Sequence, residues 1–293
     1  MDRLLQLFLV LMALGLFFGL LERLFRTHPG PAWFRRPDTH TDLAYWFFTP
    51  LVTRSVTRLG VALGVVLLVL FSGGSLAEVK ADVAAGNFPD LGVFGFGEAI
   101  RSLPLALQIP LGLMAGDFLG YWIHRAFHRG RLWSFHSVHH SSPRLDWLSS
   151  VRLHPVNDLV SRVLQAVPLL LLGFDPLVFA LYAPITTVYA LLLHADVNWS
   201  FGPARFLLAS PLFHRWHHSS QAEGRDKNFA GLFPLYDIAF GTYYFPHPGG
   251  SVKERLPLTL GTPETSVPAG FWRQLVFPFQ RRPTGKAPLA SEV

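Results

Sequence analysis

Long apolar segments restrict what this chain can fold into more than any other feature of its sequence. The first run is Leu4–Leu21, and others cover residues 59–71, 103–123 and 159–193. A helix of about 20 apolar residues is long enough to cross the hydrocarbon core of a bilayer. Half of the 293 residues are hydrophobic and 15% are charged, whereas a soluble domain carries about a quarter charged residues. The sequence therefore predicts an all-α, polytopic membrane protein.

Breaks within these runs set the expected number of helices. The run 159–193 is too long for one helix and contains Gly173-Phe-Asp-Pro176, a turn signal, so we expect a hairpin of two short helices. The run 103–123 is interrupted by two prolines and by Asp117. The total is about four or five spanning or re-entrant helices. A cleaved signal peptide is the alternative for the first run, although no small-residue cleavage site follows it.

The distribution of charge predicts the orientation in the membrane. Six arginines lie between the first and second apolar runs, whereas the next connection carries four acidic and two basic residues. Because positively charged loops stay in the cytoplasm, the first connection should be inside and the second outside. The third helix and the hairpin then return the chain to the cytoplasm, so we expect a histidine-rich helical cap on that side. The net charge of +6 fits a membrane surface, since the dense basic stripe typical of nucleic-acid binding is missing.

Histidines are concentrated in three short motifs, which hold eight of the 13 in the chain. The motifs are His124-x-x-x-His128, His136-x-x-His139-His140 and His214-x-x-His217-His218. Residues four apart on a helix share a face, so the first motif can offer two imidazoles to one ion. In each of the other motifs we expect the first and second histidines to share a face, and the third, rotated by roughly 100°, to reach a second ion. One such motif is often chance surface polarity, but three on one side of a membrane predict a site for two ions.

The ligand type narrows the choice of metal without settling it. The chain has no cysteine, which excludes disulfides, thiolate-bound haem and cysteine-bound iron–sulfur clusters. All-imidazole sites suit zinc, iron, copper or nickel, and the HExxH motif of zinc proteases is missing. A zinc-dependent membrane hydrolase therefore stays open as an alternative. A histidine-rich metal transporter or binding protein is the weaker alternative, because transport sites lie near the bilayer midplane and these motifs follow the apolar runs.

Residues 105–246 resemble the fatty acid hydroxylase / sterol desaturase superfamily, through several motifs that occur in that superfamily's order. No single motif is specific, but the set is. The motifs are Asp117-Phe-Leu-Gly-Tyr-Trp-Ile-His-Arg-Ala-Phe-His128, Leu132-Trp-Ser-Phe-His-Ser-Val-His-His-Ser-Ser142, Arg152-Leu-His-Pro155, His194-Ala-Asp-Val-Asn198, the second HxxHH, and Asn228 through Asp237 to Phe240-Gly-Thr242. The resemblance implies three regions: membrane helices and loops in 1–104, a catalytic domain in 105–246 and a tail in 247–293.

The resemblance implies an integral-membrane, non-haem di-iron oxygenase. Such an enzyme uses dioxygen to hydroxylate or desaturate a C–H bond of a lipid or sterol-like substrate. Carried over residue by residue, it makes nine histidines the metal ligands. They are His124, His128, His136, His139, His140, His194, His214, His217 and His218. The choice of two iron ions over zinc depends on this resemblance.

Two further residues are candidates for additional ligands. His154 is expected either to bind metal or to hold a ligand in place. Asn198 stands where some relatives carry another histidine, so a tenth imidazole is missing at that position. Arg129 stands where pterin-dependent relatives that cleave ether lipids carry a glutamate, which argues against pterin dependence.

Several polar residues are candidates to support the ligands. Asp117, Asn157 and Asp237, together with Asp146, are expected to accept the free N–H of a ligand imidazole. Arg152 is expected to pair with one of these carboxylates. Asp117 is the most informative of them, because an acid inside an apolar run is costly without a partner.

The sequence also indicates the kind of substrate and electron donor that the protein requires. The substrate should be a long, apolar lipid or isoprenoid that arrives from the bilayer. The chain has no nucleotide-binding GxGxxG motif, so a ferredoxin, cytochrome or reductase should supply electrons. Residues 281–293 are rich in proline and basic side chains and are expected to form a flexible tail, and Phe271–Phe279 to lie on the membrane surface.

Overall fold

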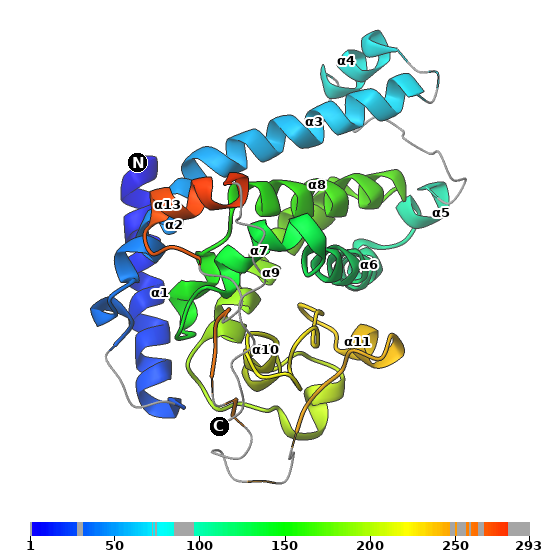
Figure 1. Ribbon diagram of the computed structural model, residues 1–293. Helices are drawn as coiled ribbons and strands as arrows, with labels where there is room; N and C mark the ends of the chain where they lie inside the picture. Colours follow the sequence, from blue (N-terminus) through cyan, green and yellow to red (C-terminus); the bar gives the residue numbers. More distant parts are fainter. Residues whose placement is uncertain are drawn as a thin grey trace.

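The computed structural model describes residues 2–27, 32–71, 73, 75–84, 97–246, 250, 256–257, 259–262 and 267–280 (Figure 1). The expected flexible tail, residues 281–293, lies outside the described residues. Within the described ranges the secondary structure is helical, apart from one isolated antiparallel bridge between Ser219 and Leu260. The predicted all-α class is therefore confirmed.

Five long helices form the framework of the fold. They are α1 (Arg3–Phe25), α3 (Arg54–Phe71), α6 (Leu105–Phe127), α8 (Pro155–Leu171) and α9 (Pro176–His194). Shorter elements connect and cap them. These are η1 (Trp33–Arg35), α2 (Thr39–Phe48), η2 (Thr49–Thr53), α4 (Leu76–Ala84), α5 (Gly97–Arg101), η3 (Gly130–Leu132), α7 (Trp133–His140), η4 (Trp147–Val151), η5 (Gly202–Phe206), α10 (Pro211–His217), α11 (Leu235–Ala239), α13 (Phe271–Val276) and η6 (Phe277–Phe279).

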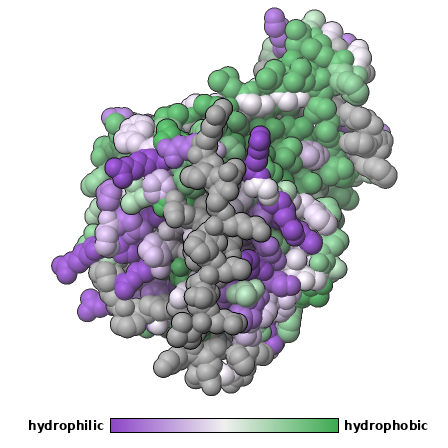
Figure 2. All heavy atoms as spheres, in the orientation of Figure 1, coloured by the Kyte–Doolittle hydropathy of each residue, from purple (hydrophilic) through white to green (hydrophobic). Residues whose placement is uncertain are grey.

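Three helical segments of the described chain are long and apolar enough to cross a membrane: Arg3–Phe25, Thr39–Phe71 and Leu177–His194. The second of these joins α2, η2 and α3 into one continuous span. Figure 2 shows apolar side chains gathered over α3 and the end of the molecule next to it, whereas polar side chains lie toward the opposite end. The protein is therefore an integral membrane protein with a polar cap.

The predicted hairpin within residues 159–193 is present as α8 and α9. Asp175 ends the turn by accepting a hydrogen bond from the backbone N–H of Leu177, which caps α9. Gly173 has a φ of +86°, and a Cβ there would lie 2.6 Å from the backbone of Gly97. The turn therefore requires glycine both for its backbone conformation and for the close approach of α5.

Glycines on α6 allow the bundle to pack closely under the cap. A Cβ at Gly116 would lie 2.5 Å from the ring of Tyr182 on α9. A Cβ at Gly120 would meet only the end of the flexible Gln165 side chain on α8, at 2.6 Å. Small residues let membrane helices approach until their backbones nearly touch. Since α6 also carries His124, this packing fixes where the first histidine motif begins.

The N-terminal helices share a core with the cap through Trp147, which is fully buried. Its ring stacks on Phe18 of α1 and meets Trp33 and Trp46 edge to face, with centroids 5.1–6.0 Å apart. Glu22 of α1 accepts a hydrogen bond from the backbone N–H of Trp147. The first two helical segments therefore hold the loop that leads from α7 to α8.

Replacing Gly116 should test the packing of α6 on α9. We expect Gly116→Ala to lower the free energy of unfolding by about 2 kcal/mol, because the new methyl group would lie 2.5 Å from the rigid ring of Tyr182. Gly120→Ala is the matched control, since Gln165 can move aside. Thermal unfolding of the two variants in detergent measures the difference. Equal midpoints for both variants would show that α6 and α9 are not closely packed.

Candidate metal centre

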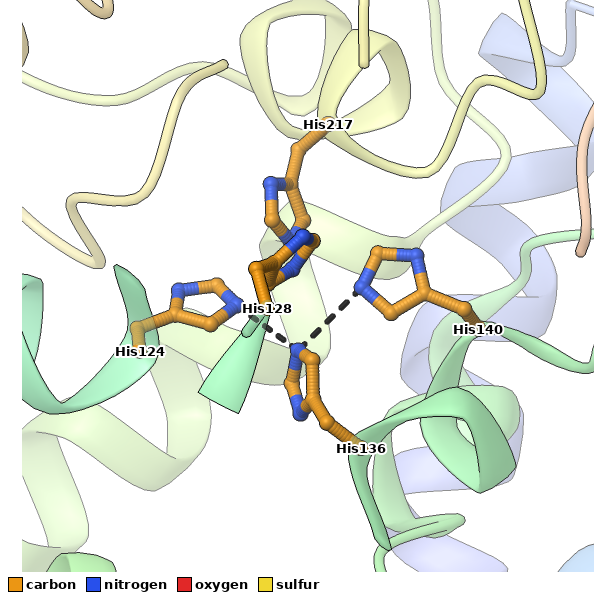
Figure 3. A group of neighbouring side chains, drawn as sticks. All are labelled: His124, His128, His136, His140 and His217. Atoms are coloured by element: carbon orange, nitrogen blue, oxygen red, sulfur yellow. Dashed lines mark hydrogen bonds between the residues drawn. The ribbon is translucent and has the colours of Figure 1, made fainter. Parts of the chain in front are cut away.

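Nine histidines lie in two neighbouring groups inside the cap. The five-histidine group consists of His124, His128, His136, His140 and His217, and the four-histidine group of His139, His194, His214 and His218. Within each group one ligand nitrogen of every residue lies within 4.8 Å of all the others. Figure 3 shows the five-histidine group, whose rings come from α6, α7 and α10 and converge on one point. These are the nine histidines that the sequence analysis selected.

The division of the HxxHH motifs differs from the prediction. His136 and His140, four residues apart on α7, share the five-histidine group, whereas His139 turns to the other group. In the second motif His214 and His218 belong to the four-histidine group, whereas His217 belongs to the five-histidine group. Residues four apart on an α-helix differ in direction by about 40°, and residues three apart differ by about 60°. The first and third histidines of each motif therefore point more nearly the same way than the first and second do.

Facing nitrogen atoms show that the groups suit cations. His124 donates its Nδ1–H to the carbonyl oxygen of Phe229 at 2.7 Å, and His136 donates its own to Asn157 Oδ1 at 2.7 Å. Each Nε2 is then left with a bare lone pair, yet these two Nε2 atoms lie 2.9 Å apart. Two acceptors cannot hydrogen-bond to each other, so only a shared cation makes this contact favourable.

The four-histidine group repeats the same arrangement. His139 donates its Nδ1–H to the carbonyl of Arg152 at 3.0 Å, and His194 donates to Ala190 at 2.8 Å, while their Nε2 atoms lie 3.1 Å apart. For metal–nitrogen bonds of about 2.1 Å, two ligands at right angles on one ion have nitrogens about 3.0 Å apart. The residues therefore fit a metal ion in each group.

Burial keeps these imidazoles in the form that binds metal. Removal from water holds the pKa of six of them well below the usual value for histidine, because a buried ring disfavours the charged form. They are His136, His139, His140, His214, His217 and His218. Neutral rings carry the lone pair that a metal ion needs.

The two groups are close enough to act as one centre. The rings of His140 and His218, one from each group, stack with centroids 4.3 Å apart. His136 and His139 are also neighbours, with centroids 5.4 Å apart. Two ions held here would share one buried space at the end of the membrane helices.

Three of the predicted supporting residues lie around the ligands, in two different roles. Asn157 accepts the hydrogen bond from His136, as expected. Asp117 instead accepts three backbone N–H groups, from Gly231 to Phe233, and Asp237 accepts the backbone N–H of Phe229 and of Ala230. The two acids therefore bind the backbone of the 229–233 loop rather than an imidazole. They act on His124 indirectly, because the Phe229 carbonyl belongs to that loop.

Arg152 pairs with carboxylates other than those expected. Its guanidinium contacts Asp42 and Asp38 at 2.6 Å, both in the N-terminal part of the chain. Arg36 forms ion pairs with Asp42 and with Asp146. Asp146 is therefore part of this buried ionic network, and it does not accept a hydrogen bond from a ligand imidazole as predicted. The network fixes the backbone of Arg152, whose carbonyl oxygen is the acceptor for His139.

His154 and Asn198 lie apart from the ligand contacts. His154 caps α8 by accepting the backbone N–H of Val156, and its other nitrogen donates to the carbonyl of Leu275 in α13. It belongs to neither histidine group. Asn198 donates its backbone N–H to Phe25 at the end of α1.

Asp226 is a supporting residue that the sequence analysis missed. Its carboxylate contacts Nδ1 of His128 at 3.1 Å, and it is the one charged acceptor among the six Nδ1 contacts made by the described ligands. The hydrogen bond from His128 holds the pKa of Asp226 below its usual value, and the charges of Arg129 and Arg225 add to this effect. Its position shortly after the second HxxHH was the only signal, and many acids follow histidines by chance.

The sequence that carries these residues matches a known protein family. The model for fatty acid hydroxylases matches residues 109–242. This segment is a fatty acid hydroxylase domain. It contains all nine grouped histidines and both acids that bind the 229–233 loop. No solved structure matches the chain significantly.

Curated relatives of the fatty acid hydroxylase domain are lipid enzymes. Ornithine lipid hydroxylase OlsE of Rhizobium tropici is 33% identical over 180 residues, which are 61% of this chain and 52% of that protein. Alkylglycerol monooxygenase of Danio rerio is 33% identical over 45% of this chain and 30% of its own length. Very-long-chain aldehyde decarbonylase GL1-6 of Oryza sativa subsp. indica is 31% identical over 43% of this chain and 21% of its own length. The chain thus spans about half or less of the length of these relatives.

Metal analysis of single variants should separate the two groups. We expect His136→Ala and His194→Ala each to lose about half of the bound metal, because each removes a ring from a different group. His154→Asn is the control, since it keeps a side chain able to cap α8 and lies outside both groups. Inductively coupled plasma mass spectrometry of the purified proteins gives the metal content. Equal losses in the control would contradict this assignment.

Replacing Asp226 should weaken one group selectively. We expect Asp226→Asn to lower metal affinity of the five-histidine group by about 10-fold, because a neutral amide polarises His128 less than a carboxylate does. Chelator competition measures the affinity of the weaker and the tighter site. Glu223→Gln, an exposed neighbour, removes the same charge without touching a ligand and should leave both affinities unchanged. A loss of the same size in Glu223→Gln would show that the effect comes from removing a nearby negative charge and not from the contact between Asp226 and His128.

Proposed function

We propose that this protein is an integral-membrane, non-haem di-iron oxygenase that hydroxylates a C–H bond of a lipid, using dioxygen and electrons from a separate donor. The observation that carries the proposal is the pair of adjacent, buried, all-imidazole groups within a fatty acid hydroxylase domain. The relatives named above as hydroxylases and monooxygenases favour oxygen insertion into a lipid substrate, and favour hydroxylation over desaturation.

Two iron ions are the proposed cofactor, one for each histidine group. Iron when bound supplies the redox chemistry that activates dioxygen, which zinc cannot supply because it has no accessible second oxidation state. The proposed ligands are the nine grouped histidines. The zinc-hydrolase alternative uses the same residues, so metal analysis of active protein distinguishes the two.

The chain's own residues orient and enclose this centre. Carbonyl oxygens of Phe229, Lys227, Arg152 and Ala190 each accept an Nδ1–H and so point the opposite nitrogen of that ring inward. Burial of the rings excludes water, which prevents side reactions at an oxidising centre. The substrate is proposed to reach the centre from the bilayer along α6 and α9, which end beside it, and along α8, which begins beside it.

The cap is proposed to face the cytoplasm. The support is the excess of arginines between the first two apolar runs, which the positive-inside rule assigns to that side. A soluble cytoplasmic donor could then reach the cap directly. The transporter alternative gains no support, because the grouped histidines of α7 and α10 lie on short helices outside the three candidate spans.

Lipid analysis of cells tests the proposed reaction. We expect cells that make the protein to contain a lipid heavier by one oxygen atom than its precursor, and His139→Ala to abolish this product because the four-histidine group loses a ligand. His154→Asn is the control and should retain the product. Liquid chromatography with tandem mass spectrometry detects the change. A product that persists in His139→Ala, or active protein that contains zinc without iron, would contradict the proposal.

A further inference from the structure

Helix α11 buries its charged side chain and exposes its apolar ones, which is the reverse of a helix that faces water. Asp237 is fully buried, whereas Leu235, Ile238 and the following Phe240 are exposed, Ile238 by 48%. In the sequence from residue 228 to residue 246, Asp237 is the only charged residue. A surface helix of a soluble domain turns its polar side to the solvent. The outer side of α11 therefore suits hydrocarbon better than water.

The contacts of α6 place α11 at the depth of a membrane span. Helix α6 is not one of the three candidate spans, but its Gly116 packs against the ring of Tyr182, which belongs to the span Leu177–His194. The hydroxyl of Tyr236 on α11 donates to the carbonyl oxygen of the nearby Met114 at 2.7 Å. Met114 precedes the first ligand of α6 by ten residues, which is about 15 Å along the helix. Helix α11 therefore lies beside the part of α6 that packs against the span.

The outward side of α6 continues this apolar surface. Its exposed large side chains recur every three or four residues, which places them on one side of the helix: Leu107, Leu111, Met114, Phe118 and Trp122. The ring of Phe240 lies 4.8 Å from that of Trp122 and 6.4 Å from that of Phe118, measured between centroids. The guanidinium carbon of Arg125 lies 5.4 Å from the centre of the Trp122 ring. A tryptophan beside an arginine is typical of the level at which a helix leaves the bilayer.

The loop that leads into α11 has its backbone N–H groups bonded inside the protein. Irregular backbone cannot lie against lipid, because no water is available there to bond its N–H and C=O groups. Asp117 accepts the N–H groups of residues 231–233, at 2.7–3.0 Å. Asp237 accepts those of Phe229 and Ala230, both at 2.8 Å. Five successive donors thus end on two buried carboxylates, which explains why α6 carries an acid among its apolar residues.

We propose that residues 229–240 form a re-entrant element, which turns back from the metal centre into the bilayer and places the outer side of α11 against lipid acyl chains. The hydrocarbon of the bilayer is the partner, because the exposed side chains are apolar and continue the outward side of α6. The element also supports the metal centre, since the carbonyl oxygen of Phe229 accepts the Nδ1 proton of His124. Contact between α11 and lipid therefore helps to hold this acceptor in place.

Site-specific fluorescence quenching tests this placement, and the lack of cysteine in the chain lets one introduced thiol report on one position. Bimane is attached to Ile238→Cys and, separately, to Leu235→Cys in the metal-loaded protein, held in phosphatidylcholine nanodiscs. Quenching is measured with iodide, which stays in water, and with lipids that carry a nitroxide on the acyl chain. Leu63→Cys, at an exposed position of α3 within a candidate span, is the lipid control. Glu223→Cys, at an exposed position of the cap, is the water control.

We expect the nitroxide lipid to quench both labels on α11 as strongly as the label at position 63. Their iodide quenching constants should be at least about 5-fold smaller than that of the label at position 223, because hydrocarbon excludes ions. An iodide constant close to that at position 223 would place α11 in water and overturn the proposal. Labels that neither agent quenches would show that another segment or a second copy of the chain covers α11, which would overturn it as well. Metal content equal to that of the parent confirms that a variant is folded, and two positions are used so that either one can decide.

Discussion

The contact between bare imidazole nitrogens is the constraint on which the rest of this structure depends. Nε2 atoms of His124 and His136 lie 2.9 Å apart, and those of His139 and His194 lie 3.1 Å apart, with both Nδ1 protons of each pair already donated to oxygen. Such lone pairs repel unless a cation lies between them. The fold therefore holds its ligands in an arrangement that is favourable only with metal, so metal binding and stability of the cap should be coupled.

Holding these rings requires support from distant parts of the chain. Asp117 and Asp237 bind the backbone of the 229–233 loop and so fix the acceptor for His124. Arg152 is fixed by carboxylates of the N-terminal segment, and its carbonyl fixes His139. Removing one partner from such a buried ionic network leaves an uncompensated charge, which is strongly destabilising. The N-terminal helices are thus part of the machinery that aims the ligands, in addition to anchoring the protein in the membrane.

The sequence predicted the features that depend on local patterns. Apolar runs and the Gly173–Pro176 turn predicted the long helices and the hairpin. The histidine spacing selected eight of the nine rings that the structure groups, and the family resemblance added His194. Contacts between residues far apart in the sequence could not be predicted in this way. The partners of Arg152 are more than a hundred residues away, and nothing in the sequence distinguished Asp38 and Asp42 from the chain's other acidic residues. The division of each HxxHH was predicted wrongly, because residues four apart on an α-helix differ in direction by about 40° and residues three apart by about 60°, so the first and third rings join the same group.

The two histidine groups have different chemical surroundings, so the two sides of the centre are not equivalent. The five-histidine group includes His128, whose Nδ1 contacts the carboxylate of Asp226, and three of its rings line a pocket of about 190 Å³ that also contains Trp133. The four-histidine group has neutral acceptors and includes His194 at the end of a candidate membrane span. Negative charge beside a ligand favours the more oxidised state of the ion that it holds, and a position next to the bilayer favours contact with lipid. The centre would therefore present one side to the polar cap and another to the bilayer, which suits a reaction that joins a water-borne reactant to a lipid.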